Sequence, residues 1–293
     1  MLPEHSGAET RRIWRHVEEI GADHAWTYDH LSWRSLRDEP WFDASTTLAA
    51  AAASTDRLRL GTLVATPNFR HPVTTAKQAM TLDHLSGGRF VLGLGAGATG
   101  ADSTALGGQQ LTPAARADRF EEFVALLDVL LRQPETTAHG RFYHAVDVRM
   151  VPGCVQRPRI PFAIAAFGKR GMRLAAAYAE TWVTIGHPGA PGDQPEATAL
   201  RVLRDQLSKL EAACHDRGRD FGDLRKLVNV SRVVADPYSS AGRFADVTGQ
   251  CAELGFTDVV VGYPRRAGVF AGDPDKFERA LAQATATTYQ EAI

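Results

Sequence analysis

The sequence predicts an α/β fold in which parallel strands alternate with helices, one strand short of an eight-stranded barrel. In the stretch 57–97, an apolar strand, a helix, a Gly-rich turn and a second apolar strand follow one another. Two apolar strands joined through a helix are typical of a parallel pair buried on both faces. A helix end followed by glycine and a strand also recurs, with Glu19-Ile20-Gly21 before one strand and Glu253-Leu254-Gly255 before another. Seven strands are predicted, and they start near residues 24, 58, 90, 161, 181, 228 and 258.

The helices between these strands are marked by apolar spacing and by residues that favour helix ends. Ile13, Val17 and Ile20 repeat at helical spacing in the first helix. Thr112-Pro113 supplies an N-cap and a first helical position for a long amphipathic helix. The same signals predict further helices over residues 45–53, 73–85, 172–179, 197–217, 241–254 and 277–286.

Three segments depart from the regular alternation. Residues 139–159 are polar and broken, which predicts a hairpin-like excursion before the strand at 160–166. Residues 187–195 are expected to form a loop, and the strand near 228 is expected to run to 235. Only Met1-Leu2-Pro3 precedes the first helix, so we expect the first barrel strand to be truncated or missing, as in a sequence that begins too late.

Composition excludes several classes of function. The chain has 293 residues, 44% of them hydrophobic and 23% charged, which is enough for one large domain with a substantial core. The net charge of −1 argues against nucleic acid or a membrane as partner, and no apolar run reaches the roughly 18 residues of a membrane span. Cys154, Cys214 and Cys251 are far apart and form no metal motif, which favours buried thiols, no bound metal and a cytoplasmic location.

Four motifs carry a resemblance to a known family. Arg70-His71-Pro72, Ala76-Lys77, the run TLDHLSGGR at 81–89 and the run LGLGAG at 92–97 together resemble the core signature of the luciferase-like flavin and deazaflavin oxidoreductases. This resemblance implies an α/β (β/α)8 TIM barrel of the bacterial-luciferase type over a single domain, residues 1–293. It also implies a flavin-type ring lying across the carboxyl ends of the strands, and a homodimer.

The ends of the second and third predicted strands are the first expected cofactor contacts. The spacing Gly95-x-Gly97-x-x-Gly100 also matches a dinucleotide fingerprint, but the next helix begins only near Pro113, which disfavours that interpretation. The alternative is that Gly95 and Gly97 let the backbone approach a flat ring closely. In the family a non-prolyl cis peptide often lies at the earlier strand end. The resemblance assigns cofactor binding here to Val64, Ala65, Thr66, Gly95, Ala96, Gly97 and Ala98.

A second expected cofactor contact is the run Phe167-Gly168-Lys169-Arg170, between a strand and a helix. A helix N-terminus that carries two cations is suited to a phosphate, although a solvated basic turn is the structural alternative. Similar loops in the family hold the cofactor phosphate with several glycines, whereas this chain has Ala165, Ala166 and Phe167.

The pair Asp29-His30 ends the first predicted strand, where catalytic residues of barrels are found. A single histidine is more often structural, but the resemblance places His30 against the ring as the catalytic residue, with Asp29 also at the cofactor. Histidine can donate a hydrogen bond or move a proton near neutral pH. Trp33 and Asn68 are expected to contact substrate, with a loop anchor as the structural alternative for Trp33. The Arg70-His71-Pro72 motif is expected to be architectural.

The resemblance implies an oxidoreductase that uses reduced coenzyme F420 for hydride transfer to or from a small-molecule substrate. One alternative is an FMN-dependent monooxygenase, and a second is a non-catalytic flavin-binding relative. The sugar-phosphate branch of the family carries an acidic proton donor directly after the loop glycine, where this chain has Ala98, so that reaction is disfavoured. The substrate is expected to meet the loops 33–44, 100–112, 139–158 and 187–195.

Overall fold

A computed structural model describes residues 1–187 and 195–291 of the chain. The chain divides into two compact units. The first comprises Met1–Arg15 with His24–Ala165, and the second comprises His16–Asp23 with the residues from Ala166 onward. Helix α1 (Gly7–Glu19) contributes to both. The prediction of a single domain stays a prediction.

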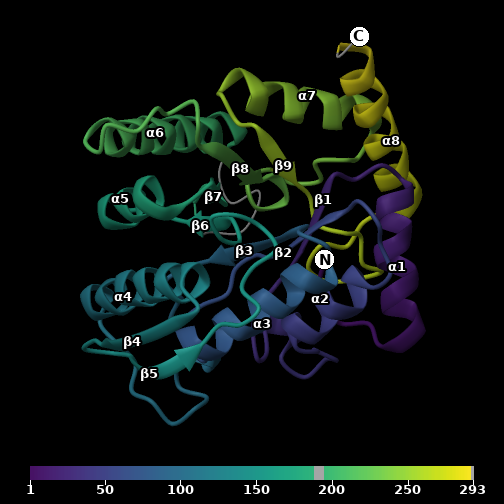
Figure 1. The fold of residues 1–293 in the computed structure, drawn as a ribbon. Coiled ribbons are helices and arrows are strands. Elements are labelled where there is room, and N and C mark those ends of the chain that lie inside the picture. Colours follow the sequence, from purple (N-terminus) through teal and green to yellow (C-terminus); the bar gives the residue numbers. More distant parts are fainter. Residues whose placement is uncertain (188–194, 292–293) are drawn as a thin grey trace. The chain divides into compact units, whose positions relative to one another are not determined.

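The first unit contains four parallel strands in the order β1, β2, β3, β6 (Figure 1). Every residue of β3 is buried, as expected for a strand covered on both faces. The strands are β1 (His24–Thr27), β2 (Arg59–Thr62), β3 (Phe90–Leu94) and β6 (Phe162–Ala165), and the helices between them are α2 (Ala44–Ala52), α3 (Pro72–Leu85) and α4 (Pro113–Arg132). The predicted cap is present, since the side chain of Thr112 accepts a hydrogen bond from the backbone N–H of Ala115.

Close pairing of β2 with β3 depends on Gly93. A Cβ atom at this position would lie 1.8 Å from the carbonyl oxygen of Thr62. The hydroxyl of Thr62 donates to the carbonyl of Gly93 at 2.8 Å and accepts from its N–H at 3.1 Å. The glycine is therefore required by backbone approach within the sheet.

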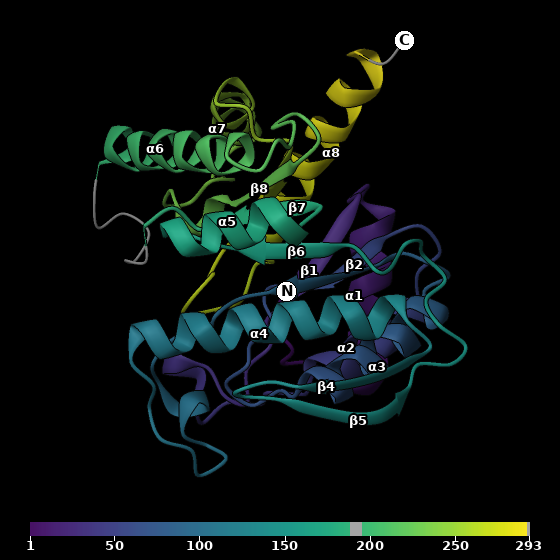
Figure 2. The same ribbon diagram turned by 60° about the vertical axis from the view of Figure 1, so that its left-hand side comes forward.

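An antiparallel hairpin of β4 (Glu135–His139) and β5 (His144–Arg149) lies beside α4 (Figure 2). It begins four residues before the predicted excursion, because its first strand is short and mostly polar and lacks a strand signal. The carboxylate of Glu122 on α4 accepts hydrogen bonds from the backbone N–H groups of Arg141, Phe142 and Tyr143. This one side chain thereby fixes the turn of the hairpin to the helix.

The second unit contains parallel strands in the order β7, β8, β9. They are β7 (Thr181–Thr184), β8 (Arg225–Asn229) and β9 (Asp258–Val260), with α5 (Lys169–Tyr178), α6 (Glu196–His215), α7 (Ala241–Glu253) and α8 (Pro274–Glu291). The prediction that a strand runs from residue 228 to residue 235 was wrong, because the strand covers Arg225–Asn229. Arg225 pairs with Asp258 and the ammonium of Lys226 lies 4.0 Å from the Phe221 ring centre, so these two polar residues start β8. The segment Val230–Arg232 forms a 3-10 turn instead.

Other sequence predictions can be compared directly with the described residues. No strand precedes α1 in the described chain, and the amino group of Met1 donates a hydrogen bond to the carbonyl of Trp26. Most of the predicted loop 187–195 lies outside the described residues. Cys154, Cys214 and Cys251 are buried free thiols. Among the described residues, no helix combines the length and the apolar character that crossing a membrane requires.

Candidate functional site

The carboxyl ends of β1, β2 and β3 place the predicted residues of the first unit at one edge of its sheet, because these strands are parallel neighbours. The segments that follow β2 and β3 remain in contact. The N–H of Gly95 donates to the carbonyl of Ala65 at 2.9 Å, and Ala65 forms a bridge with Leu94. The structure thus brings together Val64, Ala65 and Thr66 with the segment Gly95–Ala98. Their contact with a cofactor ring stays a prediction.

The two glycines of this segment are explained by contacts within the protein. A Cβ atom on Gly95 would lie 2.5 Å from Cγ2 of Val64. Gly97 has φ of +76°, and a Cβ atom there would lie 2.6 Å from Oδ1 of Asn68. Both glycines therefore let the loop after β2 pack against the loop after β3. The peptide bond between Leu63 and Val64 is cis, as the family resemblance implied for this strand end.

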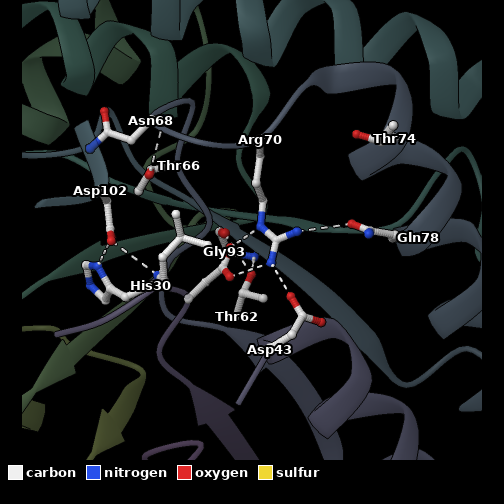
Figure 3. Close-up of polar contacts among 12 residues, drawn as sticks. His30, Asp43, Thr62, Thr66, Asn68, Arg70, Thr74, Gln78, Gly93 and Asp102 are labelled. Carbon is white, nitrogen blue, oxygen red and sulfur yellow. Dashed lines mark hydrogen bonds and ion pairs between the residues drawn. The ribbon is translucent and has the colours of Figure 1, made fainter. Parts of the chain in front are cut away.

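His30 is held by an aspartate from a different loop. Its Nδ1 lies 2.6 Å from Oδ2 of Asp102 (Figure 3). The other carboxylate oxygen accepts a hydrogen bond from the backbone N–H of Leu31 at 3.2 Å. Asp102 lies in the 3-10 turn Ala101–Ser103, which follows β3, and its side chain is 8% exposed. The pair thus joins the ends of two strands.

This pairing determines which atom of His30 can exchange protons. A carboxylate only accepts hydrogen bonds, so Nδ1 carries the hydrogen and the opposite nitrogen, Nε2, carries the lone pair of the neutral ring. In the chain as described, no residue forms a hydrogen bond with Nε2, and the side chain of His30 is 32% exposed. Nε2 can therefore accept a proton when the ring is neutral and donate one when it is charged.

Aromatic side chains surround His30. The Nε1–H of Trp41 donates to the carbonyl oxygen of His30 at 2.7 Å, and the rings of Trp33 and Trp41 stack with centres 6.3 Å apart. Trp33 is buried at 7% exposure and also meets the ring of Tyr28 edge-on, so it packs between Tyr28 and Trp41. Its predicted contact with substrate stays a prediction. Trp41, which is only partly buried, presents more of its ring to solvent.

Asp29 has a buried ion pair as its principal contact. Both carboxylate oxygens accept hydrogen bonds from the guanidinium of Arg70. The same guanidinium reaches Asp43 at 3.2 Å and Gln78 at 3.1 Å (Figure 3). Burial raises the pKa of Asp29, and the hydrogen bonds from Arg70 oppose that rise. Arg70 thus ties the end of β1 to the loop before α3, in keeping with the architectural role predicted for its motif. The cofactor contact predicted for Asp29 stays a prediction.

In the second unit, the predicted phosphate-binding run lies at the N-terminus of α5. Gly168 is the N-cap and supplies no side-chain cap, and the first turn holds no acidic residue but does hold Lys169 and Arg170. The N-terminus of a helix attracts anions, and nearby cations add to this attraction. A Cβ atom on Gly168 would meet nothing within 4 Å, which leaves space beside the backbone. These residues fit a phosphate group.

Two residues of the site were missed by the sequence reasoning, Asp102 and Trp41. The acidic position sought there was the one after Gly97, which is Ala98, whereas the carboxylate that meets His30 lies four residues further along. Trp41 does fall within 33–44, one of the loops expected to meet substrate. Both could have been proposed as polar or aromatic residues in loops that follow strand ends.

Comparison with known proteins identifies the family of the chain. Residues 2–288 match the family model described as luciferase-like monooxygenase. A 4-hydroxyprotoasukamycin monooxygenase of Streptomyces nodosus subsp. asukaensis is 32% identical over 78% of this chain and 61% of its own length. An F420-dependent glucose-6-phosphate dehydrogenase of Beutenbergia cavernae is 34% identical over 75% of this chain and 62% of its own length. The chain thus spans about three fifths of the length of these two relatives.

Solved structures show the same fold. The coenzyme F420-dependent tetrahydromethanopterin reductase of Methanopyrus kandleri superposes with a TM-score of 0.74 at 17% identity, covering 99% of this chain and 97% of that one. The monooxygenase RslO1 of Streptomyces bottropensis superposes with a TM-score of 0.73 at 21% identity, covering 97% and 93%. The predicted fold class, an α/β barrel of the bacterial-luciferase type, is confirmed. The chain belongs to the luciferase-like monooxygenase family of oxidoreductases.

Proposed function

We propose that the chain is an oxidoreductase that uses coenzyme F420 for hydride transfer to or from a small organic substrate. The observation that carries the proposal is the pair of His30 and Asp102 at the carboxyl ends of β1 and β3, with Nε2 of the histidine available for proton exchange. The F420-dependent relatives and the F420-dependent reductase with the same fold support the choice of cofactor. We further propose that the protein works as a homodimer in the cytoplasm.

When bound, a reduced deazaflavin supplies a hydride to a substrate carbon. His30 would deliver a proton from Nε2 to the substrate atom that gains negative charge, or remove one in the reverse direction. Asp102 would keep the imidazole in the tautomer that leaves Nε2 facing outward and would stabilise the charged ring. The aromatic side chains of Trp41 and Trp33 would exclude water on one side of His30.

The residues predicted to hold the cofactor fall into two groups. In the first unit, Val64, Ala65, Thr66 and the segment Gly95–Ala98 would face the ring with backbone atoms and small side chains. In the second unit, the N-terminus of α5 with Lys169 and Arg170 would bind a phosphate of the cofactor.

FMN-dependent oxygenation is the second candidate, and the similarity to two monooxygenases favours it. The two candidates are separated by titrating the purified protein with F420 and with FMN while fluorescence is followed. We expect F420 to bind at least about tenfold more tightly, a difference of about 1.4 kcal/mol. Tighter binding of FMN, together with oxygen consumption on addition of its reduced form, would replace the first candidate by the second. Binding of either cofactor without any turnover would instead indicate a non-catalytic flavin-binding relative.

The phosphate contact predicts the effect of a double substitution. Changing Lys169 and Arg170 to Ala is expected to weaken cofactor binding about 10–100-fold, because two charge-assisted contacts are lost, and the loss should be larger at low salt. The dissociation constant is measured by fluorescence quenching at two ionic strengths. Changing Arg201 and Arg204 on α6, both exposed, removes the same charge elsewhere in that unit and serves as the control. An unchanged dissociation constant in the Lys169 and Arg170 variant would refute the contact.

A further inference from the structure

Arg119 on α4 is a partly buried cation without a carboxylate partner among the residues that the structure describes. Its one hydrogen bond runs from Nη2 to the side-chain oxygen of Asn68, at 2.8 Å. Its Nε is buried and has no hydrogen-bond partner there. Burial lowers the pKa of Arg119, and the nearby charge of Arg116 adds to that effect. Folding thus removes part of this cation from water and gives it a neutral amide as its partner.

Two arginines of the first unit have buried side chains that are paired with carboxylates. Arg70 is bound by Asp29 and Asp43, and Arg159 donates to Asp128 at 2.6 Å. Both also reach a further oxygen, on Gln78 and on Ile160 respectively. Arg119 differs, because a single neutral amide is its partner. An anion supplied by a ligand would offset the partial desolvation of this cation.

The position of Arg119 connects it to the proposed cofactor edge. Asn68, which accepts from Arg119, donates from Nδ2 to the carbonyl of Ala98 at 3.0 Å and packs against Gly97. Asn68 thus connects the guanidinium to the loop that follows β3, and Figure 3 shows it close to Thr66. A ligand along the segment Gly97–Ala98 would meet Asn68, the side chain that holds the guanidinium of Arg119.

A second unmatched polar group lies near the arginine. The hydroxyl of Tyr143 is buried and has no hydrogen-bond partner within the described residues, and it interacts electrostatically with Arg119. Tyr143 comes from the turn of the hairpin that Glu122 anchors, and its ring meets those of His71 and Phe123 edge-on. Burial raises the pKa of this hydroxyl, so it stays a neutral donor. Two donors with unfilled capacity therefore lie in one region of the first unit.

We propose that Arg119, held by Asn68, binds an anionic oxygen of a ligand that lies along the loop Gly97–Ala98. The ligand class is a carboxylate or a phosphate, since these match the planar guanidinium. Its source is either the charged tail of the cofactor or an acidic group of the substrate. The proposal rests on the proposed function in one respect, that a ligand binds at the ends of β2 and β3, and it does not depend on His30.

The test compares probes that differ in their anionic groups. Dissociation constants are measured for the wild type, Arg119→Gln and Arg116→Gln with FMN against riboflavin, and with F420 against its phosphate-free deazaflavin fragment. Inorganic phosphate and benzoate are then tested on the protein saturated with cofactor, through their effect on the melting temperature. Arg116 is partly buried and lies one turn away on α4. Arg116→Gln removes the same charge as Arg119→Gln, so this variant controls for long-range electrostatics.

If the cofactor supplies the anion, Arg119→Gln weakens the binding of FMN or F420 about 10–100-fold. The dissociation constant of the corresponding phosphate-free compound then changes by no more than about twofold. If the substrate supplies it, all four cofactor constants are unchanged but stabilisation by phosphate or benzoate is lost. Equal effects of Arg116→Gln and Arg119→Gln, or no effect on any anionic probe, would overturn the proposal. So would a fall in the melting temperature of the ligand-free Arg119→Gln protein with every anion affinity unchanged, since that marks a structural bridge. Failure of the wild type to bind either riboflavin or the deazaflavin fragment would instead refute the proposed function.

Discussion

His30→Ala is expected to lower turnover by about 10²–10⁴-fold, the usual contribution of a positioned general acid or base. The fold should persist, because the side chain is one third exposed and its one side-chain hydrogen bond goes to Asp102. Much of the cofactor affinity should also persist, since the predicted contacts are spread over several loops. Circular dichroism, cofactor titration and single-turnover reduction on the same variant measure these three quantities separately.

Asp102→Asn tests whether the carboxylate sets the tautomer of His30. An amide can hydrogen-bond Nδ1 in either direction, so part of the population carries its proton on Nε2 and turnover is expected to fall about tenfold or more. A structural role alone would lower the melting temperature and leave the turnover of the folded protein unchanged. Survival of turnover within a few-fold in His30→Ala would place the proton donor elsewhere, at His71, Trp33 or a bound water.

Arg70→Met is expected to lower the free energy of unfolding at neutral pH by about 3–5 kcal/mol. The substitution leaves the carboxylate of Asp29, which is 1% exposed, buried without its cation. Asp29→Asn combined with Arg70→Met removes both charges and should recover much of the loss. Urea unfolding of the two variants and the wild type measures the difference, and equal stability of the single and double variants would contradict the buried pair as its source.

The same variant should show a specific pH dependence. Burial raises the pKa of Asp29, and removing Arg70 removes the hydrogen bonds that oppose the rise, so the folded-state pKa increases further. A folded pKa above the unfolded value means that stability is fully present below the unfolded pKa and is lost as pH rises through the folded pKa. Arg70→Met should therefore be closest to the wild type near pH 4 and deviate increasingly toward pH 8. A deviation that is constant over this range would exclude titration of Asp29 as the cause.

The strand–helix alternation could be predicted from the sequence because it depends on local patterns. Buried parallel strands such as Phe90–Leu94 are continuous apolar runs, and caps such as Thr112 act on neighbouring residues. All seven strands of the alternation begin within three residues of the predicted positions. The largest of these shifts, at β8, occurred where polar residues start a strand through contacts with distant side chains. Such a signal is absent from local composition.

The candidate site was only partly predictable, for a related reason. His30 and the segment Gly95–Ala98 were predicted because their positions follow from strand ends and from a motif shared with the family. Asp102 lies 72 residues from His30 in the chain, and nothing in either local stretch indicates that their side chains meet. The same holds for Arg119, which on the sequence is one basic residue among several on an amphipathic helix.

The sequence by itself thus determined the order of elements, the family and the edge of the first sheet where His30 lies. The tertiary structure decided which charges are matched: Asp29 by Arg70, His30 by Asp102, and Arg119 by no carboxylate in the described chain. The physical reason is that hydrophobic periodicity and capping act over a few residues. The free energy of a charge depends instead on its burial and on partners that folding brings from distant segments.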